Sequence, residues 1–351
     1  MSPEPETFRP PAGAPSSSGT PAQVTDLLGG LLHIAYAERP EVVTVATGFT
    51  PDSARDRAEL RASALASLRA LTVPVPEKEP AGSYPANAAA SSQLPIRVLG
   101  LADFMPDPPD DGPERVSGIG VLTGERYLVP AEVVWTDEAG ARVEPTLVGL
   151  VADRREGVSG AIADLLAHDV VTRWWADPRT PLHNMSRRVP GMLPSGVADA
   201  LTMMRLRVSA FVLPASDFPI AVVGVSGDGT TIAAAASRSV TAAVREAFLR
   251  AMAARAQPWD TLPTADSLRR LTVWHRETDY LTHLERWATA SVPPPSEPSD
   301  PLGWADIACR RFGHEPILIG RTPATAAKVI CPGAACHHRA PAGTPLPCPV
   351  P

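Results

Sequence analysis

The chain has 351 residues, of which 44% are hydrophobic and 20% charged, so it can bury the core of one large domain or two smaller ones. Its 32 basic and 38 acidic side chains give a formal net charge of −6, which offers no electrostatic reason to expect nucleic acid or an anionic membrane as a partner. No apolar run approaches the roughly 20 residues of a membrane span, and no signal peptide is evident, so we expect a cytoplasmic protein.

Five periodic segments follow one another along the chain. Apolar residues at helical spacing predict a helix over 53–71, and GVLTGERYLVPAEVVW, residues 120–135, predicts a strand, a turn at Thr-Gly-Glu and a second strand. A second helix is predicted over 157–175. Residues 218–237 predict a β-hairpin, because the Asp-Gly step supplies the positive φ of a tight turn, and a third helix follows over 239–257. Together they indicate an α+β (layered α/β) domain.

Proline-, serine- and glycine-rich stretches separate these segments. We expect residues 1–22 to be disordered and residues 23–351 to form one domain, with loops or linkers near 73–93, 105–118 and 292–301.

A proline-rich tail is expected at 341–351. It ends with Pro347, Pro349 and Pro351, which cannot continue a helix or pair inside a sheet, so the tail is expected to be extended and stiff. On composition alone, it reads as a disordered tail.

The four cysteines all fall in the last 43 residues. A cytosolic protein is not expected to form disulfides. The stretch CPGAACHH offers a weak zinc site formed by Cys331, Cys336, His337 and His338. Its Cys–Cys step is wider than the usual zinc knuckle, so free thiols and surface histidines are the simpler interpretation.

In this order, the segments resemble the YcaO family, and within it the azoline-forming cyclodehydratases that act on ribosomally made peptides. The resemblance runs from about residue 24 to 351. It rests on 120–135, on GLVADRREGVSGAIADLLAHDVVTRWW, on FPIAVVGVSGDGTTIAAAAS followed by AAVREAFLRA, and on PLPCPVP. It implies a YcaO-like fold of mixed sheets flanked by helices, with ATP and Mg²⁺ in a cleft lined by glutamates from three helices.

The chemistry that the resemblance implies is phosphorylation of a peptide amide oxygen after a Cys, Ser or Thr side chain attacks the carbonyl carbon. Phosphate then leaves and an azoline ring remains. Carboxylates are needed because a triphosphate carries about four negative charges, which a divalent metal must bridge to the protein. The proline tail is implied to reach into this cleft.

Most of the family's site positions are altered in this sequence. On the first helix Ser63 keeps the family's serine, but its two glutamates fall on Ala66 and Arg69. On the second helix, the glutamate, glutamate, arginine and aspartate of the family fall on Asp164, Ala167, His168 and Asp169. On the third, a metal-binding glutamate falls on Arg250 and a glutamine on Ala254, and the helix's only acidic residue is Glu246. Upstream, Val148 takes the place of an asparagine before Gly149.

The substitutions leave two roles open for the new arginines. They could bind phosphate directly, or they could pair with Asp164, Asp169 or acidic groups of a partner in a structural role. His168 and Asp169 are not expected to form an acid–base pair, because adjacent helical residues point about 100° apart.

We therefore expect a catalytically degenerate YcaO-like subunit that scaffolds or activates an intact YcaO cyclodehydratase, in a dimer or hetero-oligomer that handles a precursor peptide. One alternative is a divergent but active ATP-dependent cyclodehydratase that recruits Asp52, Asp153 or Asp164. Another is a leader-peptide-binding module that uses the N-terminal strands.

Overall fold

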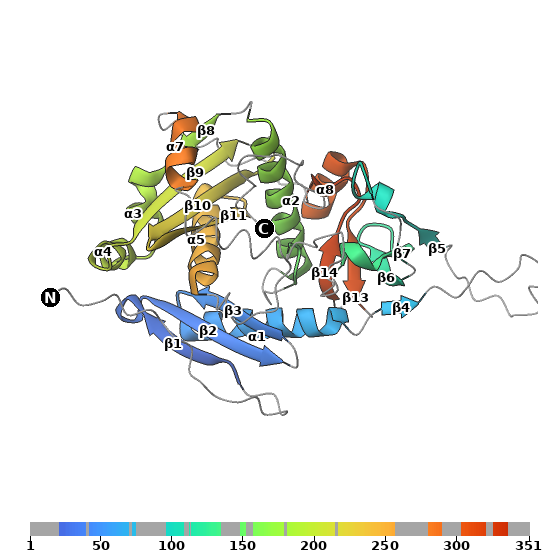
Figure 1. Cartoon of the computed structure of the whole chain (residues 1–351), viewed down its shortest axis with the longest axis horizontal. Coiled ribbons are helices and arrows are strands. Elements are labelled where there is room, and N and C mark those ends of the chain that lie inside the picture. The colour runs from blue at the N-terminus through green and yellow to red at the C-terminus, as the bar shows by residue number, and fades with distance from the viewer. Residues whose placement is uncertain are drawn as a thin grey trace, which may run out of the picture.

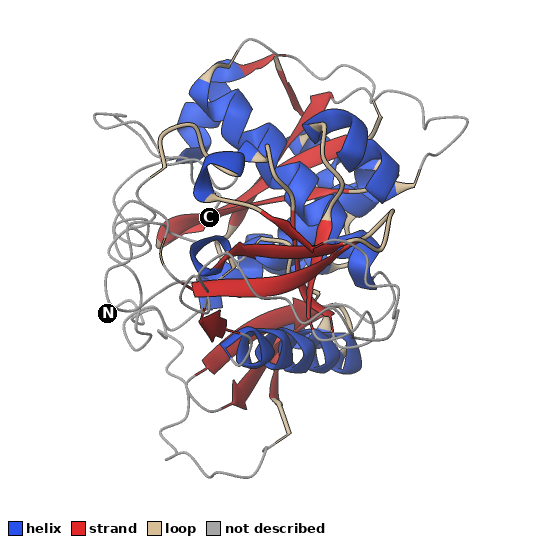
Figure 2. Cartoon of the chain, turned by 90° about the vertical axis from the view of Figure 1, so that its right-hand side faces the viewer, coloured by secondary structure: helices blue, strands red, loops and turns tan. Residues whose placement is uncertain are grey.

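The computed structural model describes residues 21–39, 42–69, 72–74, 96–108, 112, 114–134, 148–151, 157–178, 181–214, 217–256, 280–289, 303–320 and 326–335. These residues form three sheets and their flanking helices, an α+β architecture (Figures 1 and 2). None of the helices in these ranges is long and apolar enough to cross a membrane.

The N-terminal sheet is antiparallel and has the order β1 (Gln23–Leu27), β2 (Leu32–Arg39), β3 (Val42–Gly48). One long helix, α1 (Pro51–Arg69), packs against it. The contact is built almost entirely from alanine: Ala22, Ala35, Ala37, Ala46, Ala54, Ala58 and Ala62. With such small side chains the backbones come close, and a Cβ on Gly48 would lie 2.6 Å from the Ala54 nitrogen.

The central sheet has five strands in the order β11 (Gly229–Ala236), β10 (Pro219–Gly227), β9 (Arg207–Pro214), β8 (Leu182–Asn184), β12 (Ala288–Thr289). All neighbours are antiparallel except β8 and β12. Both faces are buried, because alternate residues of β9 and β10 enter two different hydrophobic clusters. Val223 and Val225 contribute to one cluster, and Ile220 and Val222 to the other.

Helices cover the two faces of this central sheet. On one face lie α3 (Val189–Met192), α4 (Val197–Met203) and α5 (Val240–Ala256); on the other lie α2 (Gly157–Ala176) and α7 (Tyr280–Trp287), and α8 (Trp304–Phe312) packs against α2. The helix α2 is buried along most of its length, because a second sheet approaches it from its other side (Figure 1).

That third sheet has the order β14 (Ala326–Ile330), β13 (Ile317–Gly320), β6 (Glu114–Gly120), β7 (Arg126–Pro130), β5 (Ile96–Val98), and β4 (Thr72–Pro74) also pairs with β6. Short 3-10 helices punctuate the chain: η1 (Leu28–Gly30), η2 (Leu101–Asp103), η3 (Ala131–Val133) and η4 (Ser186–Arg188).

The three predicted helices and the hairpin are confirmed as α1, α2, α5 and β10–β11. The hairpin turn has Gly229 at φ 88°, as its Asp-Gly sequence requires. The strand pair predicted at 120–135 is shifted: β6 ends at Gly120, residues 121–124 form the turn, and η3 replaces the end of the second strand. Glu315 explains the turn, because its carboxylate accepts the Leu122 and Thr123 amides at 2.9 and 3.0 Å.

Two of the expected loops have paired strands at their margins. The strand β4 extends into the loop expected at 73–93, and β6 begins at Glu114, inside the loop expected at 105–118. These two segments pair with each other, Thr72 opposite Val116 and Pro74 opposite Glu114, and such long-range pairing leaves no local mark in a proline-rich sequence. The stretches 1–20, 292–301 and 341–351 lie outside the described residues.

The turn after α4 holds an arginine in a conformation that favours glycine. Arg205 has φ 57°, its amide donates to Thr202 O at 3.0 Å, and the Leu206 amide donates to Leu201 O at 2.9 Å. These are the two bonds of a Schellman turn, in which glycine usually occupies the left-handed position. The arginine side chain is exposed.

We predict that Arg205→Gly stabilises the protein by about 0.5–1 kcal/mol, since a left-handed non-glycine residue costs roughly 1–2 kcal/mol and glycine gives part of this back in chain entropy. Urea unfolding monitored by circular dichroism measures the change. Arg188→Gly is the control: Arg188 has φ −97°, so glycine there should lower stability instead. A destabilised Arg205→Gly protein would contradict the strain.

Candidate functional site

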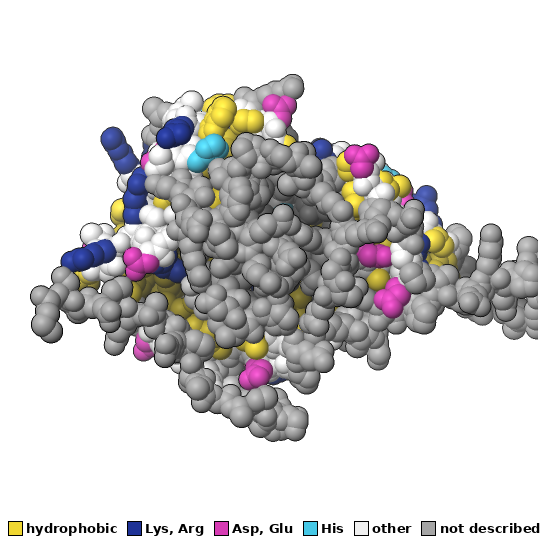
Figure 3. Space-filling view, in the orientation of Figure 1, with side chains coloured by type: hydrophobic (Ala, Val, Ile, Leu, Met, Phe, Trp, Pro, Cys, Tyr) yellow, Lys and Arg dark blue, Asp and Glu magenta, His cyan; other side chains and the backbone are white. Residues whose placement is uncertain are grey.

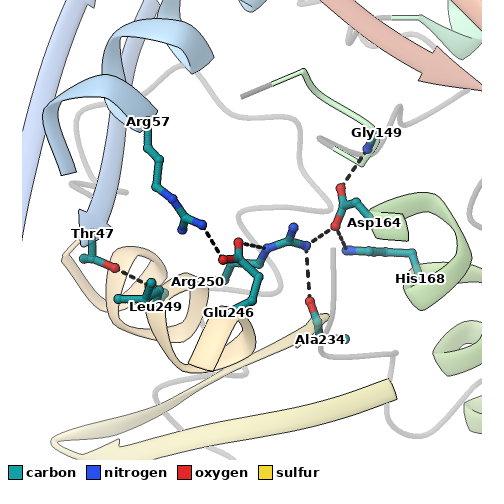
Figure 4. A network of polar contacts seen from close by, with 9 residues as sticks. All are labelled: Thr47, Arg57, Gly149, Asp164, His168, Ala234, Glu246, Leu249 and Arg250. Atoms are coloured by element: carbon teal, nitrogen blue, oxygen red, sulfur yellow. Dashed lines mark hydrogen bonds and ion pairs between the residues drawn. The ribbon is translucent and has the colours of Figure 1, made fainter. Parts of the chain in front are cut away.

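The helices α1, α2 and α5 meet at a chain of charged side chains (Figure 4). At its centre is Arg250 of α5, which lies between two carboxylates. Its Nε donates to Glu246 Oε1 at 2.9 Å, one turn earlier on the same helix, and its Nη1 ion-pairs with Asp164 of α2. The same Nη1 donates to the Ala234 carbonyl oxygen on edge strand β11 at 3.2 Å. One guanidinium therefore binds two helices and a sheet edge.

The Asp164 carboxylate is held on its other side by the turn before α2. Its Oδ2 accepts the Gly149 amide at 2.8 Å. Gly149 has φ 76°, and a Cβ there would lie 2.3 Å from the Val329 carbonyl oxygen, so only glycine fits. The position after Val148 thus serves to bring a backbone donor to a buried carboxylate.

The chain of charges continues to α1 through Glu246. Its Oε2 forms an ion pair with Arg57, so Glu246 lies between two arginines from different helices. Arg61 lies one turn beyond Arg57 on the same face of α1, near enough to Asp164 and Arg250 to feel their charges. Among the described residues, the side chain of Arg61 makes no hydrogen bond or ion pair.

These contacts shift the protonation of the acidic groups downward. Burial alone would raise the pKa of Glu246, but Arg57 and Arg250 bring that pKa down to about 2. Burial alone would also raise the pKa of Asp164, but Arg250, His168 and the Gly149 amide hold that pKa below its ordinary value. Burial lowers the pKa of Arg250, an effect that the two carboxylates outweigh, so this pKa is raised. All three groups are charged at neutral pH.

His168 completes the cluster as an uncharged group. Its Nε2 lies 3.6 Å from Asp164 Oδ1, one turn away on α2. Burial lowers its pKa from 6.5 to about 4, and the opposing attraction of Asp164 is offset by Arg250 and Arg61. A neutral imidazole here fills space beside the ion pair without adding a charge.

Asp169 is fully buried and belongs to a separate cluster, as the 100° rotation between adjacent helical residues predicts. Its Oδ1 accepts Arg173 Nε at 2.9 Å and the Ala335 amide at 2.7 Å, and its Oδ2 accepts Arg311 Nε at 2.6 Å. It joins α2 to α8 and to the segment after β14. Asp169 is therefore a buried aspartate held by hydrogen bonds to groups other than His168.

The structure brings together only part of the predicted set of site residues. Arg250 pairs with Asp164, which was one of the two roles left open for the arginines. Ser63 is exposed and Ala66 half-buried on α1, Ala167 is buried, and Ala254 is half-buried near the end of α5. Arg69 is the last residue of α1, and its side chain lies outside the description. Asp52 is exposed and pairs with Arg55 at 2.8 Å, and Asp153 lies outside the described residues.

Arg57 and Arg61 are the residues that sequence reasoning missed. The sequence did contain a signal for them. Arg57 and Arg61 are four residues apart, and each precedes one of the regularly spaced alanines Ala58 and Ala62, so the two arginines could have been predicted to share a face of α1. What no local pattern gives is that this face meets Glu246, which is 189 residues away.

The donor set does not fit a magnesium ion. Within the described ranges, no group of three or more His, Cys, Asp or Glu side chains is placed to hold a metal. Asp164 and Glu246 each take a guanidinium, and Asp169 faces another cluster. Mg²⁺ prefers several oxygen ligands in octahedral geometry, which this arginine-filled centre does not offer.

Part of the zinc candidate can be placed. The thiol of Cys331 is buried and contacts the His314 carbonyl oxygen at 3.4 Å, within a small cluster that includes Val148 and Leu165. Cys336, His337 and His338 lie outside the described residues, as do Pro347, Pro349 and Pro351.

No protein-family model and no curated protein matches this sequence. Among solved structures, the chain is similar to YcaO from Methanopyrus kandleri bound with AMPPCP and Mg²⁺, with a TM-score of 0.60 and 15% identity over 91% of this chain and 86% of that one. A chain of the E. coli microcin synthetase McbBCD complex has a TM-score of 0.60 and 10% identity over 92% of this chain and 90% of that one. A heterocyclase in complex with substrate and cofactor has a TM-score of 0.57 and 14% identity over 88% of this chain and 49% of its own chain. This likeness confirms the expected YcaO-like fold, and at these identities it establishes the fold alone.

We predict that stability falls as pH falls from 7 to about 2, in two steps. His168 has a folded pKa below its unfolded value of 6.5, so it costs the folded state stability as pH falls from about 6.5 to 4. Glu246 has a folded pKa of about 2, so its contribution is present above about 4.5 and is lost toward 2. Each step is worth about 3 kcal/mol.

His168→Gln separates the two steps, since it should flatten the free energy of unfolding between pH 6.5 and 4 and leave the lower step in place. Urea titrations at closely spaced pH values measure both. An unchanged upper step in the variant would assign that step to another group.

A second prediction concerns Asp169. Asp169→Asn leaves two arginines without their shared anion and should destabilise the protein by about 2–4 kcal/mol. It should also speed amide hydrogen exchange at Ala335, which donates to this carboxylate. Asp199→Asn, an exposed change on α4, is the matched control. It should change the free energy of unfolding by no more than about 0.5 kcal/mol and leave exchange at Ala335 unchanged. Unchanged exchange at Ala335 would show that Asp169 does not hold that segment.

Proposed function

We propose that this chain is a catalytically degenerate YcaO-like subunit of a system that makes azole- or azoline-modified peptides, and that it scaffolds or activates an intact YcaO cyclodehydratase. The observation that carries the proposal is the position of Arg250 between Asp164 and Glu246. Arg250 and Arg57 together balance the charge of these two carboxylates, and both carboxylates are ion-paired within the protein, which leaves them poorly available to a metal–phosphate complex.

The electrostatic argument is one of competition for charge. A magnesium–triphosphate complex needs free carboxylates to hold its metal, and each of the two here would first have to break a largely desolvated pair with arginine. The chain retains the fold while its charged centre is already neutralised internally. A subunit with this arrangement serves as a partner surface better than as a phosphoryl-transfer enzyme.

The partner side of the proposal draws on the similar solved chains. Two of these structures are the E. coli microcin synthetase McbBCD complex, in one case with pro-MccB17 bound. By analogy, we place this chain in a cytoplasmic hetero-oligomer that handles a precursor peptide. A pull-down from the native host that returned no peptide-modifying protein would count against this assignment.

A second candidate is metal-independent anion binding, which Arg61 favours. Burial lowers the pKa of Arg61, Asp164 raises it and Arg250 lowers it, so this guanidinium lies within a cluster of three arginines and two carboxylates. A phosphate or carboxylate group bound there would supply the missing anion.

Calorimetric titration with a non-hydrolysable ATP analogue distinguishes these candidates. We predict no heat of binding, with Mg²⁺ or with EDTA, from protein shown to be folded. Binding in EDTA that is lost in Arg61→Gln would establish the anion site. Binding that requires Mg²⁺ would overturn the proposal in favour of an active cyclodehydratase.

The Arg250→Glu variant tests whether the arginine occupies a former metal position. Three carboxylates would then converge, so the variant should melt lower than the wild type in EDTA and recover several degrees with millimolar Mg²⁺, while the wild type should not respond. Arg126→Glu makes the same charge change at an exposed position of β7 and should not respond either. A variant that ignores Mg²⁺ would show that the centre lacks metal-site geometry.

A further inference from the structure

A second basic region lies on the surface, away from the Arg250 cluster. Its exposed arginines come from η4, from the turn after α4, from the start of β9 and from the last turn of α7: Arg187, Arg188, Arg205, Arg207 and Arg286. We call these five residues the arginine surface. Figure 3 shows dark-blue side chains gathered over α3, α4 and α7 on this face.

A hydrogen bond and an ion pair tie these elements into one surface. The Ala210 amide of β9 donates to Ser186 Oγ of η4 at 3.2 Å, which places η4 beside β9. Arg207 of β9 ion-pairs with Glu285 of α7, which places the end of α7 beside the start of β9. The arginines therefore belong to neighbouring elements and not to distant parts of the molecule.

Large apolar side chains are exposed among the arginines. Met203 is 79% exposed, Met204 53% and Trp287 47%, and each lies within two residues of an arginine of the surface. They make up half of the exposed large hydrophobic side chains of the described residues. Methionine and tryptophan beside arginine form a combination that is enriched at protein interfaces.

The charge of this surface opposes that of the whole chain. Its elements η4, α3, α4, α7 and the start of β9 carry two carboxylates, Asp199 and Glu285, and Glu285 is already paired with Arg207. A positive excess therefore remains on a chain of net charge −6. The overall negative charge disfavours a long polyanion such as nucleic acid, while a short acidic segment meets only the local positive field.

Arg205 belongs to this surface although its backbone conformation does not favour arginine. It occupies the left-handed position of the Schellman turn, with φ 57°. No hydrogen bond or ion pair of its side chain occurs within the described ranges. Leu28, which within the described ranges is the second non-glycine residue of positive φ, differs in this respect, because its side chain is buried in the core. Strain at Arg205 is thus not offset by packing.

We infer that the arginine surface binds an acidic segment of a partner protein, with carboxylates on the arginines and apolar side chains against Met203, Met204 and Trp287. The inference does not depend on the proposed catalytic silence of the Arg250 cluster, since none of its residues belongs to that cluster.

Fluorescence anisotropy with labelled peptides tests the inference on the full chain. The probe is a peptide of Glu-Leu-Glu-Gly repeats, compared with Lys-Leu-Lys-Gly repeats, Glu-Gly-Glu-Gly repeats and single-stranded oligothymidine. We expect the first peptide to bind best, with an affinity that falls as salt rises. Tight oligothymidine binding, or equal binding of the basic peptide, would overturn the inference.

Arg205→Gly supplies the sharpest variant, because it should raise the melting temperature by about 1–3 °C while weakening the acidic peptide about threefold. A binding loss caused by damage to the fold cannot have this signature. Arg286→Gln should weaken binding by a similar factor, and Arg126→Gln on β7 should leave it unchanged. Wild-type affinity in both Arg205→Gly and Arg286→Gln would overturn the inference.

Discussion

The arrangement of the three helices depends on the ion pairs that two carboxylates form with a shared guanidinium, that of Arg250. Asp164 and Glu246 come from different helices and converge in a largely desolvated space, where like charges would repel strongly. Arg250 lies between them and attracts both, and Arg57 supplies the second positive charge that balances the pair. Because Glu246 also takes Arg57, the same neutralisation extends to α1, so the packing of α1 and α2 on α5 is coupled through charge as well as through apolar contact.

Two clusters of opposite purpose share the helix α2. Asp164 and His168 face the arginines of α1 and α5, while Asp169 turns toward α8 and the Ala335 amide. The first cluster fixes the interior of the fold. The second fixes the last described segment of the chain, so a single turn of α2 connects the candidate site with the start of the C-terminal region.

Periodicity revealed the elements of this fold, and contacts between distant segments decided the rest. The apolar spacing of α1, α2 and α5 and the Asp-Gly turn of β10–β11 are local patterns, and all four were predictable. The pairing of β4 with β6 and the capping of the 121–124 turn by Glu315 join residues far apart in sequence, so composition pointed to loops or to longer strands instead. Pairing of Arg250 with Asp164 belongs to one of the two roles that the sequence left open for the new arginines. The further ion pair between Arg57 and Glu246 could not be predicted, because helical spacing shows which residues share a face but not what that face contacts.

The alanine contact beneath α1 limits how the charged centre can vary. The helix and the sheet meet through the methyl groups of alanines, and no longer neighbouring side chain could be shortened to make room. Any larger residue at Ala54, Ala58 or Ala62 must therefore push the helix away from the sheet. Arg57 lies on that helix, and the displacement would move its guanidinium relative to Glu246. The alanines therefore determine how far the Arg57 guanidinium lies from Glu246. Replacing one of them with a larger apolar residue would weaken this ion pair without changing any charged residue.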